Sequence, residues 1–281
     1  MPHVSPPQLR QATTQPVVVR IHDYDLNSFA EVAANFDREH FAYVVTPNVD
    51  HLIRFYDDPS FRELYATAGF ILNDSRFLSS VVKFAKGIKL PVCTGSDLTE
   101  TVLAKIAKPN DRIVLIGSSA EQAKALESRY GLTSLKHFDP PMGFIRDTNA
   151  VEACLQFIET QSPFRFCFLA IGCPQQEIVA NKLRERGIAR GLAFCIGASI
   201  NFLTGTERRA PHWMQKAGIE WAFRLFQDPG RLAKRYLVRG PRIFRLLKHI
   251  QFELVHPAAK QSQELQNLPN SMGSTSSGQT N

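Results

Sequence analysis

Asp74 stands at a point in the sequence where a general base could act. It follows the apolar run "GFIL" (69–72) and Asn73, and it precedes a pattern typical of a helix over 75–87. A carboxylate at such a position could take a proton from a hydroxyl group that attacks a substrate. Aspartate is also a common helix N-cap, a role that requires no catalysis. Both interpretations of Asp74 stay open at this point.

Thr46 and Asn48 lie on either side of Pro47, directly after another apolar run, "FAYVV" (41–45). Their hydroxyl and amide groups could hydrogen-bond a sugar or a nucleotide. Asn48 could equally be the N-cap of the helix that the pattern predicts from residue 49. The sequence does not decide between these two roles.

The segment "GCPQQE" (172–177) begins another predicted helix, and Pro174 suits a first helical turn. The free N–H groups of such a turn form an anion-binding site. Gln176 and Glu177 would add amide and carboxylate contacts, so we expect Gly172, Pro174 and these two side chains to contact a substrate.

The segment "GSSAEQ" (117–122) could cradle a phosphate at Gly117, although a single glycine is a weak signal. Neither the glycine spacing of a dinucleotide-binding fingerprint nor a P-loop lysine motif occurs in the chain.

The segment "DYD" (23–25) could hold a divalent ion, but Asp25 also looks like the cap of a helix that begins near Asn27. The cap is the interpretation that we favour. We expect no metal site, because no shared ligand spacing relates the histidines His51, His137 and His212.

Short apolar runs rich in β-branched residues alternate with helical patterns through most of the chain. Such strands indicate a parallel sheet that is covered on both faces. We therefore predict an α/β fold: a Rossmann-like, mostly parallel sheet with helices on both faces, plus a basic C-terminal helical appendage. The predicted strands are 16–21, 41–46, 69–74, 112–117, 164–172 and 191–197, and the predicted helices are 27–38, 49–67, 75–87, 96–108, 119–130, 148–161, 175–187 and 211–227.

Ligands of an open parallel sheet bind outside the carboxyl ends of its strands. The polar segments described above all follow predicted strands, as does "GASIN" (197–201). We therefore expect one cleft at that edge, to which Thr46, Asp74, Gly117 and Asn201 contribute.

Composition limits the class of partner and the compartment. The net charge of +7 favours an anionic partner: nucleic acid, a phosphorylated substrate or acidic lipid headgroups. The five cysteines are odd in number and no pair has CxxC spacing, so we expect free thiols in a reducing compartment. Neither a signal peptide nor a run of about 20 apolar residues is apparent, which favours the cytoplasm.

The chain divides into four parts. Residues 1–15 are polar and predict a flexible arm, and residues 257–281 are low in complexity and predict a disordered tail. Residues 16–227 predict the Rossmann-like catalytic domain. Residues 228–256 predict the basic helical appendage.

A basic, aromatic segment leads into this appendage. Residues 209–236 contain both tryptophans, Trp213 and Trp221, together with six basic residues. Between Arg224 and Lys248, eight basic residues accompany one acidic residue. This composition suits the interface of an anionic membrane, although a solvated basic helix docked on the domain would also fit. Gly240-Pro241 should break the helical pattern.

Taken together, these segments resemble the WecG/TagA/CpsF family of bacterial glycosyltransferases over roughly residues 17–245. The motifs that carry the resemblance are "TPNVDHL", "ILNDSR", "TGSDL", "GCPQQE", "GASINFLTGTERRAPHWMQKAGIEW" and "RLFQDPGRLAKRY". The last three are specific, and they occur in the family's order and spacing.

The resemblance implies an inverting, metal-independent and cofactor-free glycosyltransferase. Such an enzyme moves a hexose or N-acetylhexosamine-type sugar from a UDP donor to a polyprenyl-pyrophosphate-linked sugar during synthesis of exopolysaccharide or other cell-surface polysaccharide. It would be peripheral on the inner face of the plasma membrane.

The resemblance also implies roles for individual residues. Asp74 matches the general base, and Thr46 and Asn48 match an active-site pair. The positions that match substrate-binding segments are Gln176, Arg209, Pro211 and Trp213. The arginines expected to meet pyrophosphate or anionic headgroups are Arg224, Arg231 and Arg235.

Three positions depart from the family pattern. Ser75 follows Asp74 where glycine is usual, Asn201 replaces an aspartate, and Val92 replaces an arginine. The last two changes remove a carboxylate and a cation from the expected donor site, which leaves the donor sugar open. Arg76 could replace the missing cation.

Two other classes of protein fit parts of the pattern. A nucleic-acid-binding protein would explain the basic tail but not the acidic and amide-bearing turns. A nicotinamide-dependent Rossmann enzyme would explain the fold but lacks the glycine fingerprint. The donor sugar, the acceptor glycan and the oligomeric state, whether monomer or homo-oligomer, are not determined by the sequence.

Overall fold

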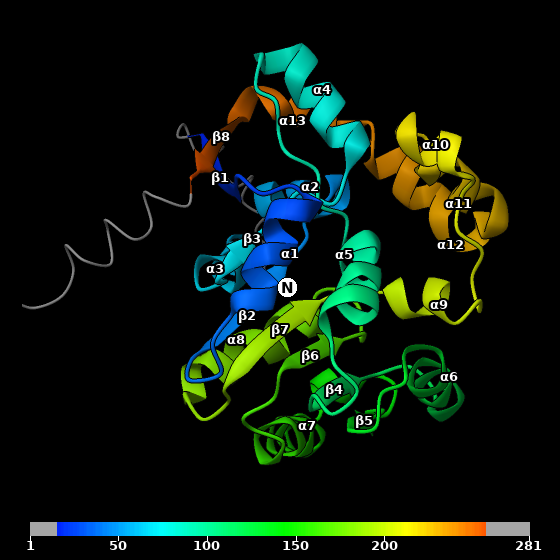
Figure 1. Ribbon diagram of the computed structural model, residues 1–281. Coiled ribbons are helices and arrows are strands. Elements are labelled where there is room, and N and C mark those ends of the chain that lie inside the picture. Colours follow the sequence, from blue (N-terminus) through cyan, green and yellow to red (C-terminus); the bar gives the residue numbers. More distant parts are fainter. Residues whose placement is uncertain (1–15, 257–281) are drawn as a thin grey trace, which may run out of the picture.

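A computed structural model describes residues 16–256 of the chain, so the predicted N-terminal arm and C-terminal tail lie outside the described residues. Its centre is a parallel sheet with the strand order β3-β2-β7-β6-β4-β5 (Figure 1). The six strands are β2 (Phe41–Val45), β3 (Phe70–Ile71), β4 (Ile113–Ile116), β5 (Leu135–Phe138), β6 (Phe166–Leu169) and β7 (Gly191–Cys195). This arrangement confirms the predicted α/β class.

Helices cover both faces of the sheet. One face carries α2 (Val49–Asp57), α3 (Pro59–Ala66), α7 (Thr148–Thr160) and α8 (Gln175–Arg186). The other face carries α1 (Leu26–Asn35), α5 (Gly95–Thr101) with the π-helical η1 (Val102–Ile106), α6 (Ala120–Tyr130) and α9 (Ser199–Leu203). The 3₁₀ turn η2 (Phe144–Arg146) precedes α7.

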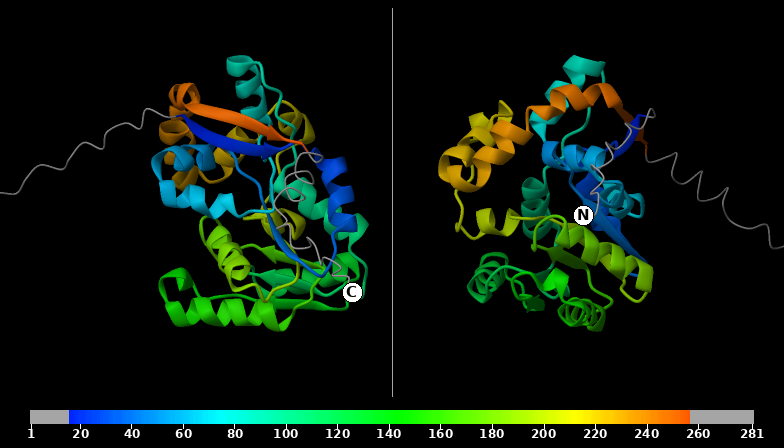
Figure 2. Two further views of the ribbon diagram at one scale, coloured as in Figure 1. Left: turned by 90° about the vertical axis from the view of Figure 1, so that its left-hand side faces the viewer. Right: turned by 180° about the vertical axis from the view of Figure 1, so that it is seen from behind.

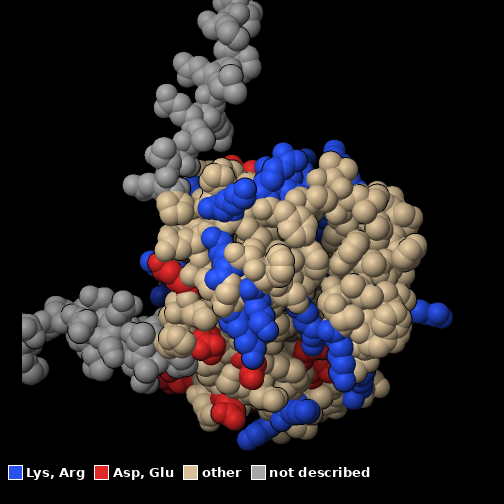
Figure 3. Space-filling view, turned by 90° about the horizontal axis from the view of Figure 1, so that it is seen from above, with Lys and Arg blue, Asp and Glu red and all other residues tan. Residues whose placement is uncertain are grey.

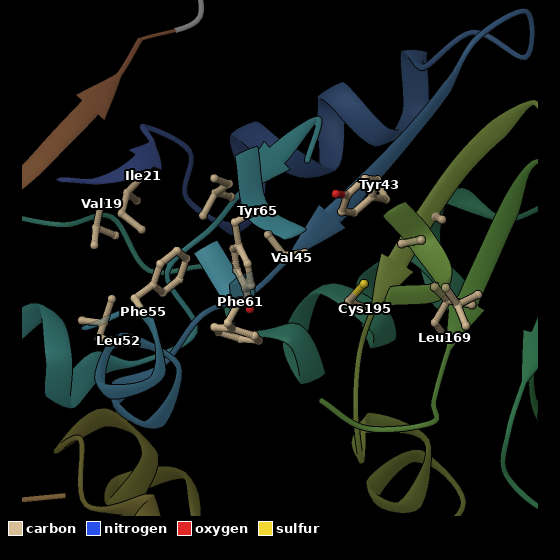
Figure 4. Packing of buried hydrophobic residues seen from close by; sticks show 14 of the residues in the cluster. Val19, Ile21, Tyr43, Val45, Leu52, Phe55, Phe61, Tyr65, Leu169 and Cys195 are labelled. Atoms are coloured by element: carbon tan, nitrogen blue, oxygen red, sulfur yellow. The ribbon is translucent and has the colours of Figure 1, made fainter. Parts of the chain in front are cut away.

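Alternate residues of each strand enter different hydrophobic cores, as the two-residue period of a strand requires. In β2, Tyr43 joins the core beneath α2 and α8, whereas Val44 joins the core beneath α1 and α5. Figure 4 shows the first of these cores, where side chains of the sheet meet aromatic rings from α2 and α3. The two cores hold the sheet rigidly, so the polar turns at its carboxyl edge have fixed positions.

The first predicted strand is not part of the main sheet. Residues Val17–His22 (β1) pair in parallel with β8 (Ile250–Val255) in a separate two-stranded sheet, which Figure 2 shows beside the main body. Strand β8 was not predicted, because it falls within the segment predicted as a helical appendage. Its partner lies more than 200 residues earlier in the chain, so the local pattern carried no signal of the pairing.

The C-terminal segment folds as a series of short helices. They are α10 (His212–Lys216), α11 (Glu220–Gln227), α12 (Pro229–Ala233), η3 (Lys234–Arg239), α13 (Arg242–Leu246) and η4 (Leu247–His249). The predicted break at Gly240-Pro241 is confirmed, since η3 ends before it and α13 begins after it. Ile243, Leu246 and Leu247 are buried in the core beneath α2, so this segment is anchored on the domain. Among residues 16–256, no helix has the length and apolar character needed to cross a bilayer.

Candidate functional site

A cavity of about 380 Å³ lies where the turns after β2 and β3 face the C-terminal helices. The domain contributes residues from the start of α2, from the turn after β3 and from the start of α4 (Arg76–Lys86). The C-terminal segment closes the other side with aromatic and charged side chains. The residues that line this cavity, called the β2–β3 cavity below, are Asn48, Val49, Asp50, Ile53, Asp74, Ser75, Arg76, Phe77, Thr94, Gln215, Gly218, Glu220, Trp221, Arg224, Arg235, Tyr236, Gly240, Pro241 and Phe244.

Asp74 is in this cavity and is not the helix cap. Ser75 caps α4, because its Oγ accepts a hydrogen bond from the N–H of Leu78. The Asp74 backbone N–H donates to the carbonyl of Pro47 at 3.0 Å, and its Oδ1 accepts from the N–H of Gly95 at 2.7 Å. The carboxylate is therefore held in place by the backbone of two neighbouring turns, and it faces the cavity.

The surroundings of Asp74 suit a proton acceptor. Burial raises the pKa of its carboxyl group to about 6, against the opposing effects of the Gly95 N–H and the positive charge of Arg224. The negative charge of Glu220 raises the same pKa further. A carboxylate with a pKa near 6 is ionised at neutral pH and yet basic enough to accept a proton during a reaction.

Thr46 and Asn48 lie next to Asp74. Asn48 is the N-cap of α2: its Oδ1 accepts from the N–H of Asp50 at 3.1 Å, and its side chain also lines the cavity. The structure thus gives Asn48 the capping role and a place in the cavity at once. Thr46 and Asp74 both lie close to Gly95. A Cβ atom added to Gly95 would be 3.1 Å from Thr46 Oγ1 and 3.7 Å from Asp74 Oδ1. A side chain at position 95 would therefore press on the Thr46 hydroxyl, while its distance to Asp74 would be an ordinary van der Waals contact.

Two arginines share one carboxylate at the edge of the cavity. Arg76 Nη2 lies 3.1 Å from Asp97 Oδ2, and Arg209 Nη2 lies 2.6 Å from Asp97 Oδ1. Burial opposes ionisation of Asp97, but the hydrogen bond from Thr94 and the charge of Arg209 hold the pKa of its carboxyl below the usual value. The structure therefore brings together two of the arginines that the sequence suggested, from segments more than 100 residues apart.

The C-terminal helices contribute two further arginines. Arg224 pairs with Glu220 at 2.7 Å and lies over the ring of Phe202, and Arg235 lies 3.7 Å from Asp50. Both line the cavity. The third expected arginine, Arg231, does not line it; this exposed side chain pairs with Asp228 at 2.6 Å.

The two tryptophans have different positions. Trp213, which the sequence suggested, is 65% exposed on α10 and does not line the cavity. Trp221 does line it, with its ring against Tyr236 at 6.1 Å between centroids. Its buried Nε1–H has no partner in the described protein. A donor so placed is available to a polar group of a ligand.

Gln176 and Glu177 lie inside the fold. Gln176 Oε1 accepts from the N–H of Gly197 at 2.9 Å, and its amide donates to Glu177 Oε1 at 3.0 Å. Both side chains are buried and neither lines the β2–β3 cavity. In this structure they join the turn after β6 to the turn after β7. Pro174 lines a second cavity, which is formed with residues of α2 and α3.

One group of side chains could hold a metal ion: ligand atoms of His51, Cys173 and Glu177 lie within 4.8 Å of one another. Burial lowers the pKa of His51 to about 3 and raises the pKa of Glu177, because it disfavours the charged form of each side chain. None of the three lines the β2–β3 cavity. The two aspartates of "DYD" have other roles, since Asp25 caps α1 as predicted and Asp23 pairs with His256 at 2.8 Å.

The turns after β4, β6 and β7 form the rest of the carboxyl edge. Gly117 and Gly172 have positive φ values of 84° and 75°, and a Cβ on Gly117 would meet the Ala170 carbonyl at 2.9 Å. Ser118 has a φ of 69°, an unusual conformation for a residue other than glycine, which marks a strained turn. Asn201 is hydrogen-bonded to Gln122 and Glu207, each at 3.0 Å.

The cavity contains several residues that were not among the predicted site residues. The charged and aromatic ones are Asp50, Phe77, Glu220, Trp221, Tyr236 and Phe244. Glu220 and Trp221 end the long motif that carried the resemblance, so a signal for them was present. The others come from helices whose contact depends on the tertiary fold.

Comparison with known proteins identifies the relatives of the chain. Residues 15–254 match the glycosyl transferase WecG/TagA/CpsF family. The chain is 26% identical over 237 residues to an N-acetylglucosaminyldiphosphoundecaprenol N-acetyl-β-D-mannosaminyltransferase from Bacillus spizizenii, an alignment that covers 81% of this chain and 88% of that protein.

Proposed function

Because the chain belongs to the WecG/TagA/CpsF family of glycosyl transferases, we propose that it transfers a sugar from a UDP donor to a polyprenyl-diphosphate-linked sugar. The name of the Bacillus relative specifies a diphosphoundecaprenol-linked acceptor and an N-acetylmannosaminyl group. Because the identity is 26%, we propose for this chain the same class of acceptor, a sugar linked to a lipid diphosphate, and leave the transferred sugar open. The donor is a UDP-hexose or UDP-N-acetylhexosamine.

One observation carries this proposal: Asp74 faces a cavity whose lining includes three arginines, two amide side chains and four aromatic rings, together with the carboxylates of Asp50 and Glu220. The Asp74 carboxylate takes the proton of the acceptor hydroxyl while that oxygen forms a bond to the anomeric carbon. The bond from the anomeric carbon to the UDP oxygen breaks in the same step, and the configuration is inverted. Asn48 and Thr46 position the sugar hydroxyls beside Asp74.

The arginines of the cavity suit the diphosphates of both substrates. Arg224 and Arg235 come from the C-terminal helices, and Arg76 and Arg209 lie on Asp97. Guanidinium groups bind phosphate oxygens in a bidentate manner and stabilise the negative charge that grows on the departing UDP. This supply of positive charge supports a mechanism without a metal ion. The strained turn at Gly117-Ser118 is a candidate contact for the nucleotide.

The C-terminal helices are proposed to lie against the cytoplasmic face of the membrane. Among the described residues, five of the most exposed large apolar side chains belong to this part of the chain: Trp213, Phe226, Leu237, Val238 and Phe244. Basic residues lie between them in the sequence. Apolar side chains mixed with lysine and arginine favour the interface of an anionic bilayer. Family membership favours this function over nucleic-acid binding and over a nicotinamide enzyme.

Thermal unfolding of the full chain with a panel of UDP-sugars, with and without EDTA, tests the proposal. A ligand at 100 times its Kd adds about 2.7 kcal/mol to the free energy of unfolding, which is easily detected. We expect UDP and one UDP-sugar to stabilise the protein, and EDTA to leave that effect unchanged. NADH serves as the negative control.

The alternatives predict different results. Loss of the stabilisation in EDTA would contradict the metal-independent mechanism. Stabilisation by NADH but by no uridine nucleotide would contradict the glycosyltransferase proposal. If uridine nucleotides stabilise the protein only when vesicles carrying a polyprenyl-diphosphate sugar are present, the acceptor binds first, which retains the proposal and fixes the order of binding.

A further inference from the structure

Helix α4 connects the active-site cavity to the molecular surface. Its first residues, Ser75 to Phe77, line the β2–β3 cavity, while Leu78 and Val82 are buried against the domain. The helix ends at Gly87, which has a φ of 72°. At a rise of about 1.5 Å per residue, Phe84 lies about 14 Å along the helix from Ser75.

The far end of α4 carries an unusual combination of side chains. Phe84 is 95% exposed, and it is flanked by the exposed lysines Lys83, Lys86 and Lys89. Residues 76–89 contain no acidic residue. A phenylalanine ring left in water forgoes the transfer free energy that it would gain in an apolar environment. The sequence around it therefore has the features of a membrane-interface contact: one aromatic ring that can insert, and lysines that can meet anionic headgroups.

The same face of the molecule continues into α13. The ring of Phe77 meets the ring of Phe244 at 6.5 Å between centroids, and Phe244 is itself 56% exposed. Arg245 and Lys248 are exposed nearby in the chain. Figure 1 shows α4 and α13 at the top of the molecule, and Figure 3, which views the molecule from above, shows lysine and arginine side chains on that side.

We propose that the α4 tip, defined as Phe84 with Lys83, Lys86 and Lys89, is a membrane-docking site that acts together with the C-terminal helices. This inference rests on the proposed function, because it assumes a substrate in the bilayer. Phe84 inserts at the level of the acyl-chain boundary, and the three lysines lie among anionic headgroups. Docking through α4 and α13 at once holds the mouth of the β2–β3 cavity toward the membrane.

The length of α4 explains why this arrangement suits the reaction. A diphosphate on a membrane lipid stays at the level of the headgroups, so its sugar reaches only a short way above the bilayer. With the α4 tip at the interface, Asp74 lies within about one and a half nanometres of the acyl boundary, a distance fixed by the helical rise. The acceptor sugar can then reach the carboxylate without leaving the membrane.

Vesicle sedimentation of the full chain tests the docking site, with phosphatidylcholine vesicles that contain or lack phosphatidylglycerol. Replacing Lys83, Lys86 and Lys89 by Gln should weaken binding to the anionic vesicles about fivefold per lysine, the factor that corresponds to about 1 kcal/mol for a basic residue at such a surface. Phe84→Ser should weaken binding about tenfold. The matched controls are Met142→Ser, another fully exposed apolar residue, and a triple Gln variant of the exposed lysines Lys105, Lys124 and Lys182.

A second measurement locates the ring. Lipids with brominated acyl chains should quench the tryptophan fluorescence of Phe84→Trp more than that of the wild type. They should not quench that of Met142→Trp more than that of the wild type. Activity on a water-soluble, short-chain diphosphate acceptor should be unchanged in Phe84→Ser, since this residue does not line the cavity.

The outcomes separate this inference from the proposed function. If the α4 variants bind vesicles as the wild type does, while substitutions at Phe226 and Leu237 abolish binding, the α4 site is refuted and the membrane proposal is retained. If the wild type binds neither vesicle, both membrane proposals fail, and turnover of the soluble acceptor then decides the transferase activity independently. If the lysine variant loses affinity for duplex DNA but not for vesicles, the patch binds nucleic acid and the inference is overturned.

Discussion

The backbone N–H of Gly95 donates a 2.7 Å hydrogen bond to Oδ1 of Asp74. One carboxylate oxygen is thereby fixed by the start of α5, a helix that begins 21 residues after Asp74. Among residues 16–256, no backbone N–H is found on the second oxygen, which can accept a proton. The hydrogen bond joins the segments "ILNDSR" and "TGSDL", since each supplies one half of the contact.

Asp74→Asn should lower turnover by about 10² to 10⁴, the usual contribution of proton transfer to a general base. Asparagine keeps the acceptor oxygen for Gly95 but cannot take a proton. Steady-state assays with the UDP-sugar found by thermal unfolding would measure the effect. Asp139→Asn, at an exposed position, should have normal turnover. Unchanged turnover in Asp74→Asn would remove Asp74 from the mechanism.

The pH dependence of activity should reflect the charges around Asp74. Because its pKa is raised to about 6, kcat/KM should fall as the pH drops below about 6 and the base becomes protonated. Arg224→Gln removes a positive charge that lowers this pKa, so the fall of kcat/KM on the acid side of the pH profile should move to higher pH. Glu220→Gln removes a negative charge that raises it, so this fall should move to lower pH. Shifts of both variants in the same direction would contradict this account.

Asp74 should also reduce the stability of the protein at neutral pH. Its pKa is higher in the folded protein than the ordinary value of 3.8, so the folded state holds the proton more tightly. Its contribution to stability is therefore greatest below about pH 4 and is lost as the pH rises through about 6. Above that range the buried charge costs about 1 to 3 kcal/mol. Asp74→Asn should thus have a higher Tm than the wild type at pH 8, and the difference should shrink toward pH 4. A Tm difference that is constant across this range would show that the carboxyl group does not titrate as described.

The sequence predicted the elements of the main sheet better than the contents of the site. Strands such as β4 and β6 were evident because both of their faces are apolar, and the capping role of Asp25 followed from local pattern. Strand β8 was missed because its six residues are defined by their pairing with β1 at the other end of the chain. A local pattern carries no information about such a distant partner.

The candidate site shows the same limit. Asp74 was recognised from its place after a strand, and its neighbours Thr46 and Asn48 came with it. Trp213 was preferred to Trp221, although it is Trp221 that enters the cavity. Both lie in one motif, and the direction of each side chain is decided by how α10 and α11 pack on the domain. Gln176 was predicted to contact a substrate, yet its side chain is buried and accepts a hydrogen bond from the N–H of Gly197 in the turn after β7.

Gly95→Ala should impair catalysis more than stability. Gly95 does not have a positive φ, so alanine meets no backbone strain there, but its Cβ would lie 3.1 Å from Thr46 Oγ1 and 3.7 Å from Asp74 Oδ1. The Thr46 hydroxyl must shift by a few tenths of an ångström, whereas Asp74 Oδ1 stays at an ordinary van der Waals distance, so the group that is displaced beside the reacting atoms is the Thr46 hydroxyl. A fall in kcat of about 10² would be typical of such a displacement near the reacting atoms. Gly230→Ala is the matched control, because nothing lies within 4 Å of the added Cβ, and it should be neutral.

A double-mutant cycle identifies the cause of the loss. Thr46→Ala removes the hydroxyl with which the new Cβ collides, so adding Gly95→Ala to Thr46→Ala should reduce kcat much less than adding it to the wild type. Residues in contact show such coupling, whereas independent sites add. Fully additive losses would mean that the alanine acts elsewhere, for instance on the hydrogen bond from Gly95 to Asp74. That result would mean that Gly95 matters for catalysis through its backbone N–H and not through the space that it leaves beside Thr46.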